Sequence, residues 1–354
     1  MTIRVTWRRV AAALVALALA GLLFAWSGVF NIAASSGHWA ISNWFLHWTM
    51  RNSVRTHTLL EAPRNPIATD GQLVSAAGHF AAACATCHGA PGQRPSPVMQ
   101  RATPHAPDLT TGETKEKWSD AELFYILKHG VKFTGMPAWG AGGRDDEVRR
   151  MVAFVRRLPG MSAAEYRRLS GAATGAGTTD ARALGGKVLA GCVACHGSDG
   201  RGRGQPDIPI LGGQNPRYLE AALAAYADGR RASAVMANAA ATLTAPERRA
   251  LAAHLAAMPG LGATPAGSAA ARRIVERGLP ERQLPACAAC HAPGKAQPVL
   301  AGQRATYLAQ RLRDWRAEEG EVDARLPQDA MAVIARRIPE EMIDPLARYL
   351  AGQR

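Results

Sequence analysis

The most continuous apolar stretch of the chain lies at its amino terminus. Residues 10–50 contain no Asp, Glu, Lys or Arg, and three arginines precede them. Residues 10–30 alone would form a helix about 31 Å long, which is enough to cross a bilayer. By the positive-inside rule, the arginines place the amino terminus in the cytoplasm and the rest of the chain on the opposite side. The pattern predicts a cytoplasmic tip and transmembrane anchor in residues 1–36, with a cleaved signal peptide as the alternative.

A second apolar pattern follows the anchor. Ile41, Trp44, Phe45 and Trp48 recur at helical spacing, so residues 37–71 are expected to hold an aromatic helix face and then a linker. Such a face suits the membrane interface or the transmembrane helices of a partner. The alternative is that the segment covers the first of the units that follow.

The rest of the chain is a threefold repeat with helical periodicity. We expect a first unit in residues 72–168, a second in 181–260 and a third in 268–354. The pattern of each unit predicts a short helix, a cysteine-containing turn, a Pro-x-Leu, a middle helix, a methionine in a loop and a final helix. Stretches rich in Gly, Ala, Thr and Pro at 170–179 and 259–271 are typical of linkers or loose crossings. The sequence therefore predicts an all-α protein with three domains behind the anchor.

All six cysteines fall in three C-x-x-C pairs, and a histidine follows each pair. C-x-x-C-H is the attachment signature of haem c, because two thioether bonds reach the vinyl groups of one porphyrin and the adjacent imidazole reaches its iron. A thioredoxin-like dithiol needs one motif on a βαβ background, and a zinc site usually pairs two C-x-x-C units. Three covalently attached haem c groups are therefore predicted. Their attachment and ligand residues would be Cys84, Cys87 and His88, then Cys192, Cys195 and His196, then Cys287, Cys290 and His291.

A methionine recurs at one position of the repeat. Aligning the final helices without gaps places Met136, Met236 and Met331 in one column. A thioether sulfur is a soft ligand for iron opposite an imidazole, so each of these methionines is a predicted sixth ligand. Met342 is a rival for the third unit, and bis-histidine ligation through His79, His105 or His129 is the general alternative, although none of these recurs. With two protein ligands on every iron, no small-molecule substrate would bind there, which favours an electron carrier over an enzyme.

Composition narrows the choice of partners. With 47% hydrophobic and 20% charged residues, the chain is neither disordered nor fibrous. Its net charge of +14 is spread over all units and only 6% of its residues are aromatic, which argues against nucleic acid. Four of the six lysines precede Met136 in the first unit: Lys115, Lys117, Lys128 and Lys132. We treat this basic rim as a hypothetical docking site for an acidic patch on an oxidase, with a solubilising surface as the alternative.

Each unit resembles a class I c-type cytochrome domain. The first is similar to single-haem domains through WSDAE at 118–122 and TGMP at 134–137. The second and third are similar to the two-domain diheme cytochromes c of bacterial periplasms, through LGGQ at 211–214 with YL at 218–219 and LAGQ at 300–303 with YL at 307–308. The resemblance implies one haem in a crevice of each helical unit, His/Met ligation, and a proline carbonyl that orients each ligand histidine. These prolines are Pro107, Pro209 and Pro298.

The third unit departs from the pattern of the other two. Ala292 follows its motif, where Gly89 and Gly197 follow the others. An acidic insert at 318–323 precedes its methionine and would either dock a basic partner or form a solvated loop.

Together these features predict a membrane-anchored triheme cytochrome c that transfers electrons in a respiratory chain. It would lie in the bacterial inner membrane, with its haem domains in the periplasm. Its partners would be a terminal oxidase, a quinol-oxidising complex or a periplasmic dehydrogenase. The alternative is the triheme cytochrome subunit of a membrane-bound periplasmic alcohol, sugar-acid or aldehyde dehydrogenase, although that family carries its anchor at the carboxyl end. A redox sensor or a haem-stabilised scaffold is a third interpretation.

Overall fold

The computed structural model describes residues 6–61, 73–171, 186–292, 294–316 and 330–352. Within these ranges the chain is helical and forms no β-strand, only two isolated bridges. The prediction of an all-α fold is therefore confirmed for the described part of the chain. The acidic insert at 318–323 and most of the predicted linker at 170–179 lie outside these ranges.

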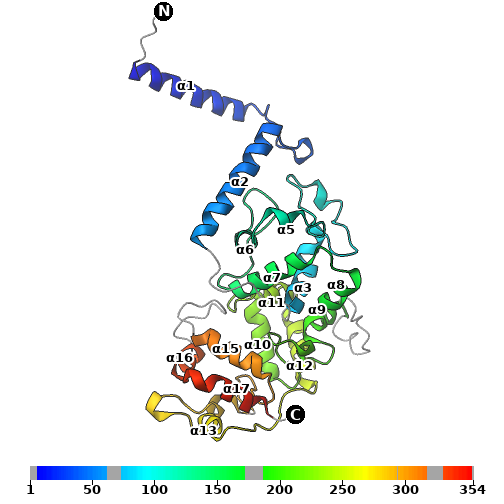
Figure 1. The fold of residues 1–354 in the computed structure, drawn as a ribbon, viewed down its shortest axis with the longest axis vertical. Coiled ribbons are helices and arrows are strands. Elements are labelled where there is room, and N and C mark those ends of the chain that lie inside the picture. The colour runs from blue at the N-terminus through cyan, green and yellow to red at the C-terminus, as the bar shows by residue number, and fades with distance from the viewer. Residues whose placement is uncertain (1–5, 62–72, 172–185, 293, 317–329, 353–354) are drawn as a thin grey trace, which may run out of the picture.

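The helices are arranged along the chain as Figure 1 shows. Met136 lies in a loop as predicted, but the prediction of a loop is wrong for Met236 and Met331, which lie in the helices Ala234–Ala240 and Ala330–Arg337. Two precede the repeat: α1 (Trp7–Trp26) and α2 (Ala40–Leu60). The first unit contains α3 (Leu73–His79), α4 (Ala85–His88), α5 (Glu113–Lys117), α6 (Asp120–His129), α7 (Asp145–Arg157) and α8 (Ala163–Ser170). The second contains α9 (Gly186–His196), α10 (Pro216–Ala227), α11 (Ala234–Ala240) and α12 (Ala245–Ala257). The third contains α13 (Ala269–Arg277), α14 (Ala288–His291), α15 (Ala305–Arg316), α16 (Ala330–Arg337) and α17 (Ile343–Ala351).

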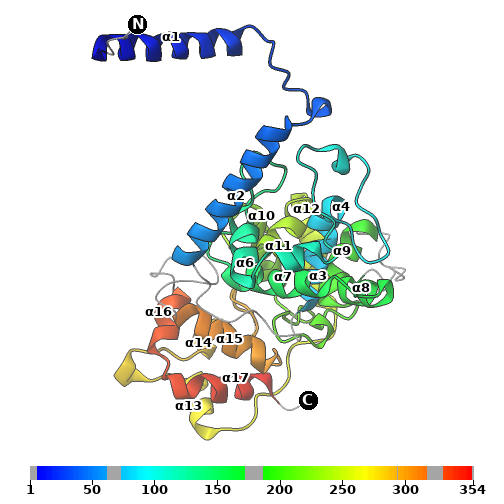
Figure 2. The same cartoon turned by 45° about the horizontal axis from the view of Figure 1, so that its top comes forward.

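Helix α1 extends away from the rest of the molecule (Figures 1 and 2). It is 20 residues long with a mean hydropathy of 2.1, and it is the one described helix long and apolar enough to cross a membrane. It buries none of its residues, and Trp7 and Trp26 at its two ends are 88% and 85% exposed. Its apolar surface is therefore left for an environment outside the protein, as in a membrane span or a signal sequence.

Helix α2 has two unlike halves. In the first half, the side chains of the predicted aromatic face are exposed, Trp44, Phe45 and Trp48 by 57%, 52% and 49%. In the second half Val54 and Thr58 are buried, and the helix packs against α6. The segment therefore covers the first unit with its second half only.

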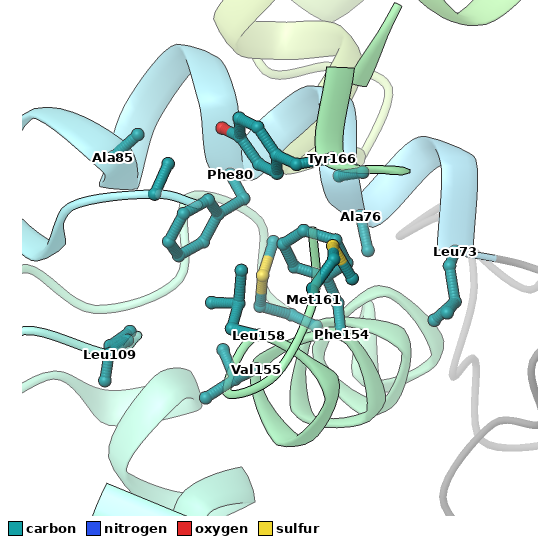
Figure 3. Packing of buried hydrophobic residues seen from close by; sticks show 13 residues of the cluster. Leu73, Ala76, Phe80, Ala85, Leu109, Phe154, Val155, Leu158, Met161 and Tyr166 are labelled. Atoms are coloured by element: carbon teal, nitrogen blue, oxygen red, sulfur yellow. The ribbon is translucent and has the colours of Figure 1, made fainter. Parts of the chain in front are cut away.

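The core of the first unit forms where α3 meets α7 and α8 (Figure 3). The rings of Phe80 and Phe154 lie with centroids 5.3 Å apart, and Tyr166 lies 6.4 Å from each. Phe80 and Phe154 are almost fully buried. Because Phe80 begins the π-helical turn Phe80–Cys84, this packing also fixes the start of the first cysteine motif.

Buried hydrophobic side chains gather in clusters that each stay within one unit. Two clusters lie in residues 73–166, one in 193–258 and one in 271–350. Capping fixes several helix starts, for example the capping boxes of Ser119 with Glu122 at α6 and of Thr244 with Glu247 at α12. These clusters support the division into three domains, which stays a prediction.

The stretch at 259–271 is fixed to both units that it joins. Leu261 N donates to Gly212 O and Gly262 N donates to Ala301 O, both at 2.8 Å. The interpretation of this stretch as a loose crossing is therefore wrong, because its backbone groups are paired with the units on either side.

Candidate haem sites

Each C-x-x-C-H motif ends a helix, and its histidine is the last helical residue of α4, α9 or α14. Gly89 and Gly197 leave the first two of these helices with φ of 71° and 78°, a conformation that glycine adopts readily. Ala292 leaves the third with φ −73° and ψ 158°, which is ordinary extended backbone. The third motif therefore does not need the glycine that follows the other two.

Burial makes four of the cysteine thiols poor nucleophiles. It raises the pKa of Cys84, Cys192 and Cys195 to about 11, and it raises the pKa of Cys287 as well. A redox-active dithiol instead needs a lowered pKa. Among the described residues, no three His, Cys, Asp or Glu side chains gather as a metal-ion site. The raised pKa values of these thiols argue against a redox-active dithiol.

Proline carbonyls orient two of the predicted ligand histidines. His88 Nδ1 lies 2.9 Å from Pro107 O, and His291 Nδ1 lies 2.9 Å from Pro298 O. A carbonyl oxygen only accepts hydrogen bonds, so Nδ1 carries the proton and Nε2 keeps the lone pair that an iron ligand needs.

His196 is more deeply buried than the other two predicted ligand histidines. The residue is 9% exposed, and burial lowers its pKa to about 4, while the Pro209 carbonyl acts in the opposite direction. Its Nδ1 atom makes no hydrogen bond of ordinary geometry with any described residue. The imidazole is therefore neutral near pH 7, as iron coordination requires.

The second and third motifs face one shared cavity of about 570 Å³. Its wall includes Cys195, His196 and Met236 from the second unit and Cys287, Cys290, His291 and Met331 from the third. Aliphatic side chains, among them Ile210, Leu219, Ile334 and Leu346, supply much of the remaining wall. A large apolar cavity that gathers thiol, imidazole and thioether groups suits a pair of porphyrins. The structure thus brings together predicted attachment and ligand residues of two units.

The first site is built on the loops around α4 and between α6 and α7. Gln100 Nε2 donates to the carbonyl oxygens of Cys87 and Ala106, both at 3.2 Å, so it joins the motif to the segment that carries the ligand-orienting proline. Met136 is half-buried, and its N donates to Thr134 Oγ1 at 3.1 Å. Sequence reasoning missed Gln100, because its partners lie 13 and 6 residues away and no local pattern marks them.

The rival ligands have other contacts. Met342 packs against the hydrophobic core of the third unit, whereas Met331 lines the cavity. His129 Nε2 lies 3.0 Å from Glu61 Oε2, and the His79 ring lies 4.9 Å from the indole of Trp139 between centroids. These contacts favour the recurring methionines as sixth ligands.

Lys128 is already paired within the protein. Its Nζ lies 2.7 Å from Glu61 Oε1 and 3.1 Å from Asp145 Oδ1, and its side chain is 25% exposed. The basic-rim hypothesis is therefore wrong for Lys128, because two carboxylates neutralise its charge. Lys132 is exposed and still belongs to the rim.

The glycine of each LGGQ or LAGQ motif permits a close approach to the segment that joins the second and third units. Gly213 and Gly302 have φ of 75° and 83°. A Cβ atom on Gly213 would lie 3.0 Å from Leu261 N, and one on Gly302 would lie 2.9 Å from Ala263 N. Both positions therefore require glycine for conformation and for space.

Two family models match the chain. Residues 71–155 match the model described as cytochrome c oxidase, cbb3-type, subunit III. Residues 183–259 match the model described as cytochrome c. The first two units thus each carry an independent match to a cytochrome family.

Several similar proteins each cover about half of the chain. A thiosulfate dehydrogenase electron acceptor of Stutzerimonas stutzeri is 35% identical over 171 residues, covering 46% of this chain and 78% of the relative. A cytochrome c4 of Pseudomonas aeruginosa is 32% identical over 194 residues, covering 52% of this chain and 92% of the relative. A crystal structure of reduced cytochrome c4 from Pseudomonas stutzeri matches with a TM-score of 0.41 at 30% identity, covering 50% of this chain and all of that one. The chain belongs to the class I c-type cytochromes and is homologous to the diheme cytochromes c4 and to the thiosulfate dehydrogenase electron acceptor.

Proposed function

We propose that the chain is a membrane-anchored triheme cytochrome c that relays single electrons between periplasmic and membrane-bound redox partners. The observation that carries this proposal is the shared cavity, whose wall combines residues of two C-x-x-C-H motifs with two recurring methionines. These residues are Cys195, His196 and Met236 of the second unit and Cys287, Cys290, His291 and Met331 of the third. Haem c supplies the one-electron chemistry when bound, and the chain binds, orients and tunes it.

The ligand pairs in this proposal are His88 with Met136, His196 with Met236, and His291 with Met331. The six cysteines hold the porphyrin edges, and the carbonyls of Pro107, Pro209 and Pro298 orient the imidazoles. Three observations support the set: the two proline hydrogen bonds, the neutral imidazole of His196, and the position of both later methionines in the cavity wall. Two protein ligands on each iron leave no position for a small-molecule substrate, so the chain is a carrier and not itself an enzyme.

Helix α1 in this proposal anchors the chain in the bacterial inner membrane with its amino terminus in the cytoplasm. Its apolar surface is exposed along its whole length, and three arginines precede or begin it. The aromatic half of α2 then lies at the periplasmic membrane interface, where Trp44 and Trp48 suit the headgroup boundary. The second half of α2, packed on α6, connects this interface to the first unit.

A terminal oxidase is the electron acceptor that the first unit favours, because this unit matches a subunit of a cbb3-type oxidase. A second candidate role is the acceptance of electrons from a periplasmic dehydrogenase. It is favoured by the similarity of this chain to a protein named thiosulfate dehydrogenase electron acceptor. In the first role the chain donates electrons to the oxidase, and in the second it accepts electrons from the dehydrogenase. Identifying the partner protein therefore distinguishes the two roles.

The test is to extract membranes in mild detergent, separate complexes on a native gel, stain for covalent haem and identify the proteins of the stained band by mass spectrometry. Co-migration with oxidase or quinol-oxidising subunits supports the respiratory relay. Co-migration with a dehydrogenase makes this chain the electron outlet of an enzyme. Two failures together would contradict a relay: a purified oxidase does not oxidise the reduced full-length chain, and an added dehydrogenase does not reduce the oxidised chain.

A further inference from the structure

One of the contacts between the first and second units is made by a buried carboxylate. Glu147 on α7 has a side chain only 4% exposed, and α7 lies beside α11 (Figures 1 and 2). Its Oε1 atom accepts a hydrogen bond from Ser233 Oγ at 2.6 Å, and its Oε2 atom accepts one from Ala234 N at 2.9 Å. The first unit itself adds two donors: Trp139 Nε1 at 3.2 Å and Arg144 Nη2 at 3.1 Å. Glu147 is thus bonded to two groups of each unit.

Ser233 connects Glu147 to Met236, a predicted iron ligand, through its hydroxyl group. It caps α11, and its Oγ accepts a hydrogen bond from Met236 N at 3.1 Å. A serine hydroxyl has one hydrogen, which it donates to Glu147 while its oxygen receives the methionine amide. Met236 is the third residue of α11 and lines the haem cavity. The position of the Met236 segment therefore depends on a hydroxyl that the neighbouring unit holds.

In the first unit, the corresponding hydrogen bonds to the methionine segment come from the same unit. Met136 N donates to Thr134 Oγ1, and the Thr134 hydroxyl donates to Val131 O at 2.7 Å, all within one loop. In the second unit the corresponding acceptor of the hydroxyl hydrogen is Glu147, 86 residues earlier in the chain. The buried carboxylate therefore has a role beyond joining two surfaces.

We propose that Glu147 is a positioning residue for Met236, so that the sulfur–iron bond and the reduction potential of the second haem depend on the docked first unit. The inference rests on the proposed His/Met ligation. The same carboxylate also receives Trp139, three residues after Met136, so it joins the segments that carry the sixth ligands of both haems. Displacement of the first unit, for example by a docking partner, would then alter the potential of the second haem.

The test compares four variants of the full-length holoprotein in detergent. Glu147→Gln removes the negative charge and one acceptor, and Ser233→Ala removes the hydroxyl that links Glu147 to Met236. Met236→Leu serves as the reference for a lost ligand. Glu247→Gln is the matched control, since Glu247 completes a capping box inside the second unit, where Thr244 N donates to its Oε2 at 2.7 Å.

The readouts are the near-red sulfur-to-iron charge-transfer band, the NMR signal of each ligated methionine methyl, and the midpoint potential of each haem. We expect Met236→Leu to abolish one methionine signal and to lower one midpoint potential. Glu147→Gln and Ser233→Ala should shift that same signal and lower that same potential. Glu247→Gln should leave all three methionine signals in place. If Met236→Leu changes no methionine signal, the proposed ligation itself fails. If it does, but the Glu147 and Ser233 variants match the wild type, the positioning role is overturned.

Discussion

Gln214 pairs with both main-chain polar groups of Val299, across the boundary between the second and third units. Its Nε2 donates to Val299 O at 3.1 Å, and its Oε1 accepts from Val299 N at 2.7 Å. Gln303 makes the same pair of bonds with Ile210, both at 3.0 Å. Val299 and Ile210 each follow the proline beside the ligand histidine of their own unit. The second and third units therefore form a reciprocal interlock. A glutamine of each unit binds the main chain of the other, next to the proline that is predicted to orient the ligand histidine.

This reciprocity predicts a stability cost when either glutamine is truncated. Gln214→Ala or Gln303→Ala leaves a buried N–H and C=O unpaired, which should lower the free energy of unfolding of the holoprotein by about 1–3 kcal/mol. Denaturant titration of the full chain measures the loss. Gln205→Ala is the control, since Gln205 Nε2 makes a single hydrogen bond, at 3.4 Å, to Arg203 O within the second unit. Equal stability of all three variants would contradict the interlock.

Met331 and Met342 are predicted to behave differently when each is replaced by leucine. Met331→Leu should remove the sixth ligand of the third haem, so one methionine methyl signal disappears and the potential of that haem falls. Met342→Leu should keep all three signals and cost about 1.5 kcal/mol of stability or less, because Met342 packs in a core where a leucine of similar volume fits. Loss of the signal in Met342→Leu would show that the ligand was assigned to the wrong methionine.

The contact between α2 and α6 is expected to weaken in acid. A hydrogen bond from Lys128, assisted by the charges of Lys128 and His129, holds the pKa of the Glu61 carboxyl below its ordinary value of 4.5. A carboxyl whose pKa is lower in the folded state contributes stability that is complete above pH 4.5 and is lost as the pH falls through the folded-state pKa. Protection factors of the second half of α2 from hydrogen exchange should therefore fall below that pH.

The control for this pH dependence is a carboxylate of another exposed ion pair. Glu61→Gln should lower the protection of α2 above pH 4.5 to the level that the wild type reaches in acid, and so remove most of the acid dependence. Glu113→Gln should not, since Glu113 pairs with Lys117 on the exposed helix α5. The same acid dependence in Glu61→Gln and in the wild type would show that Glu61 does not hold the two helices together.

Lys132 is the member of the basic rim that should affect electron transfer to an anion. Lys132→Glu should slow oxidation of the reduced protein by hexacyanoferrate by a factor of about two to ten at low ionic strength, and the effect should vanish in high salt. Lys117→Glu is the control for net charge, because it changes the charge of the chain by the same amount at a residue that pairs with Glu113 at 3.1 Å. Equal rates for the two variants at low salt would remove the rim from the docking account.

The sequence predicts the parts of this protein that depend on covalent spacing and helical period. C-x-x-C-H must be local because two sulfurs and an imidazole reach one porphyrin, and the recurring methionines follow from the register of the final helices. Contacts between distant residues carry no such local signal. Lys128 lies 67 residues from Glu61, and Glu147 lies 86 residues from Ser233. Lys128, which was expected to face a partner protein, is therefore found paired with Glu61. Glu147, for which the sequence predicted no role, is found paired with Ser233.

The most direct test of three covalent haems is the intact mass of the full-length chain after denaturation and treatment with a thiol-alkylating reagent. The account predicts the mass of the polypeptide plus three haem groups, with no alkyl group added, because all six cysteine sulfurs are in thioether bonds. A mass that includes fewer than three haems, with alkylated cysteines in their place, would contradict it.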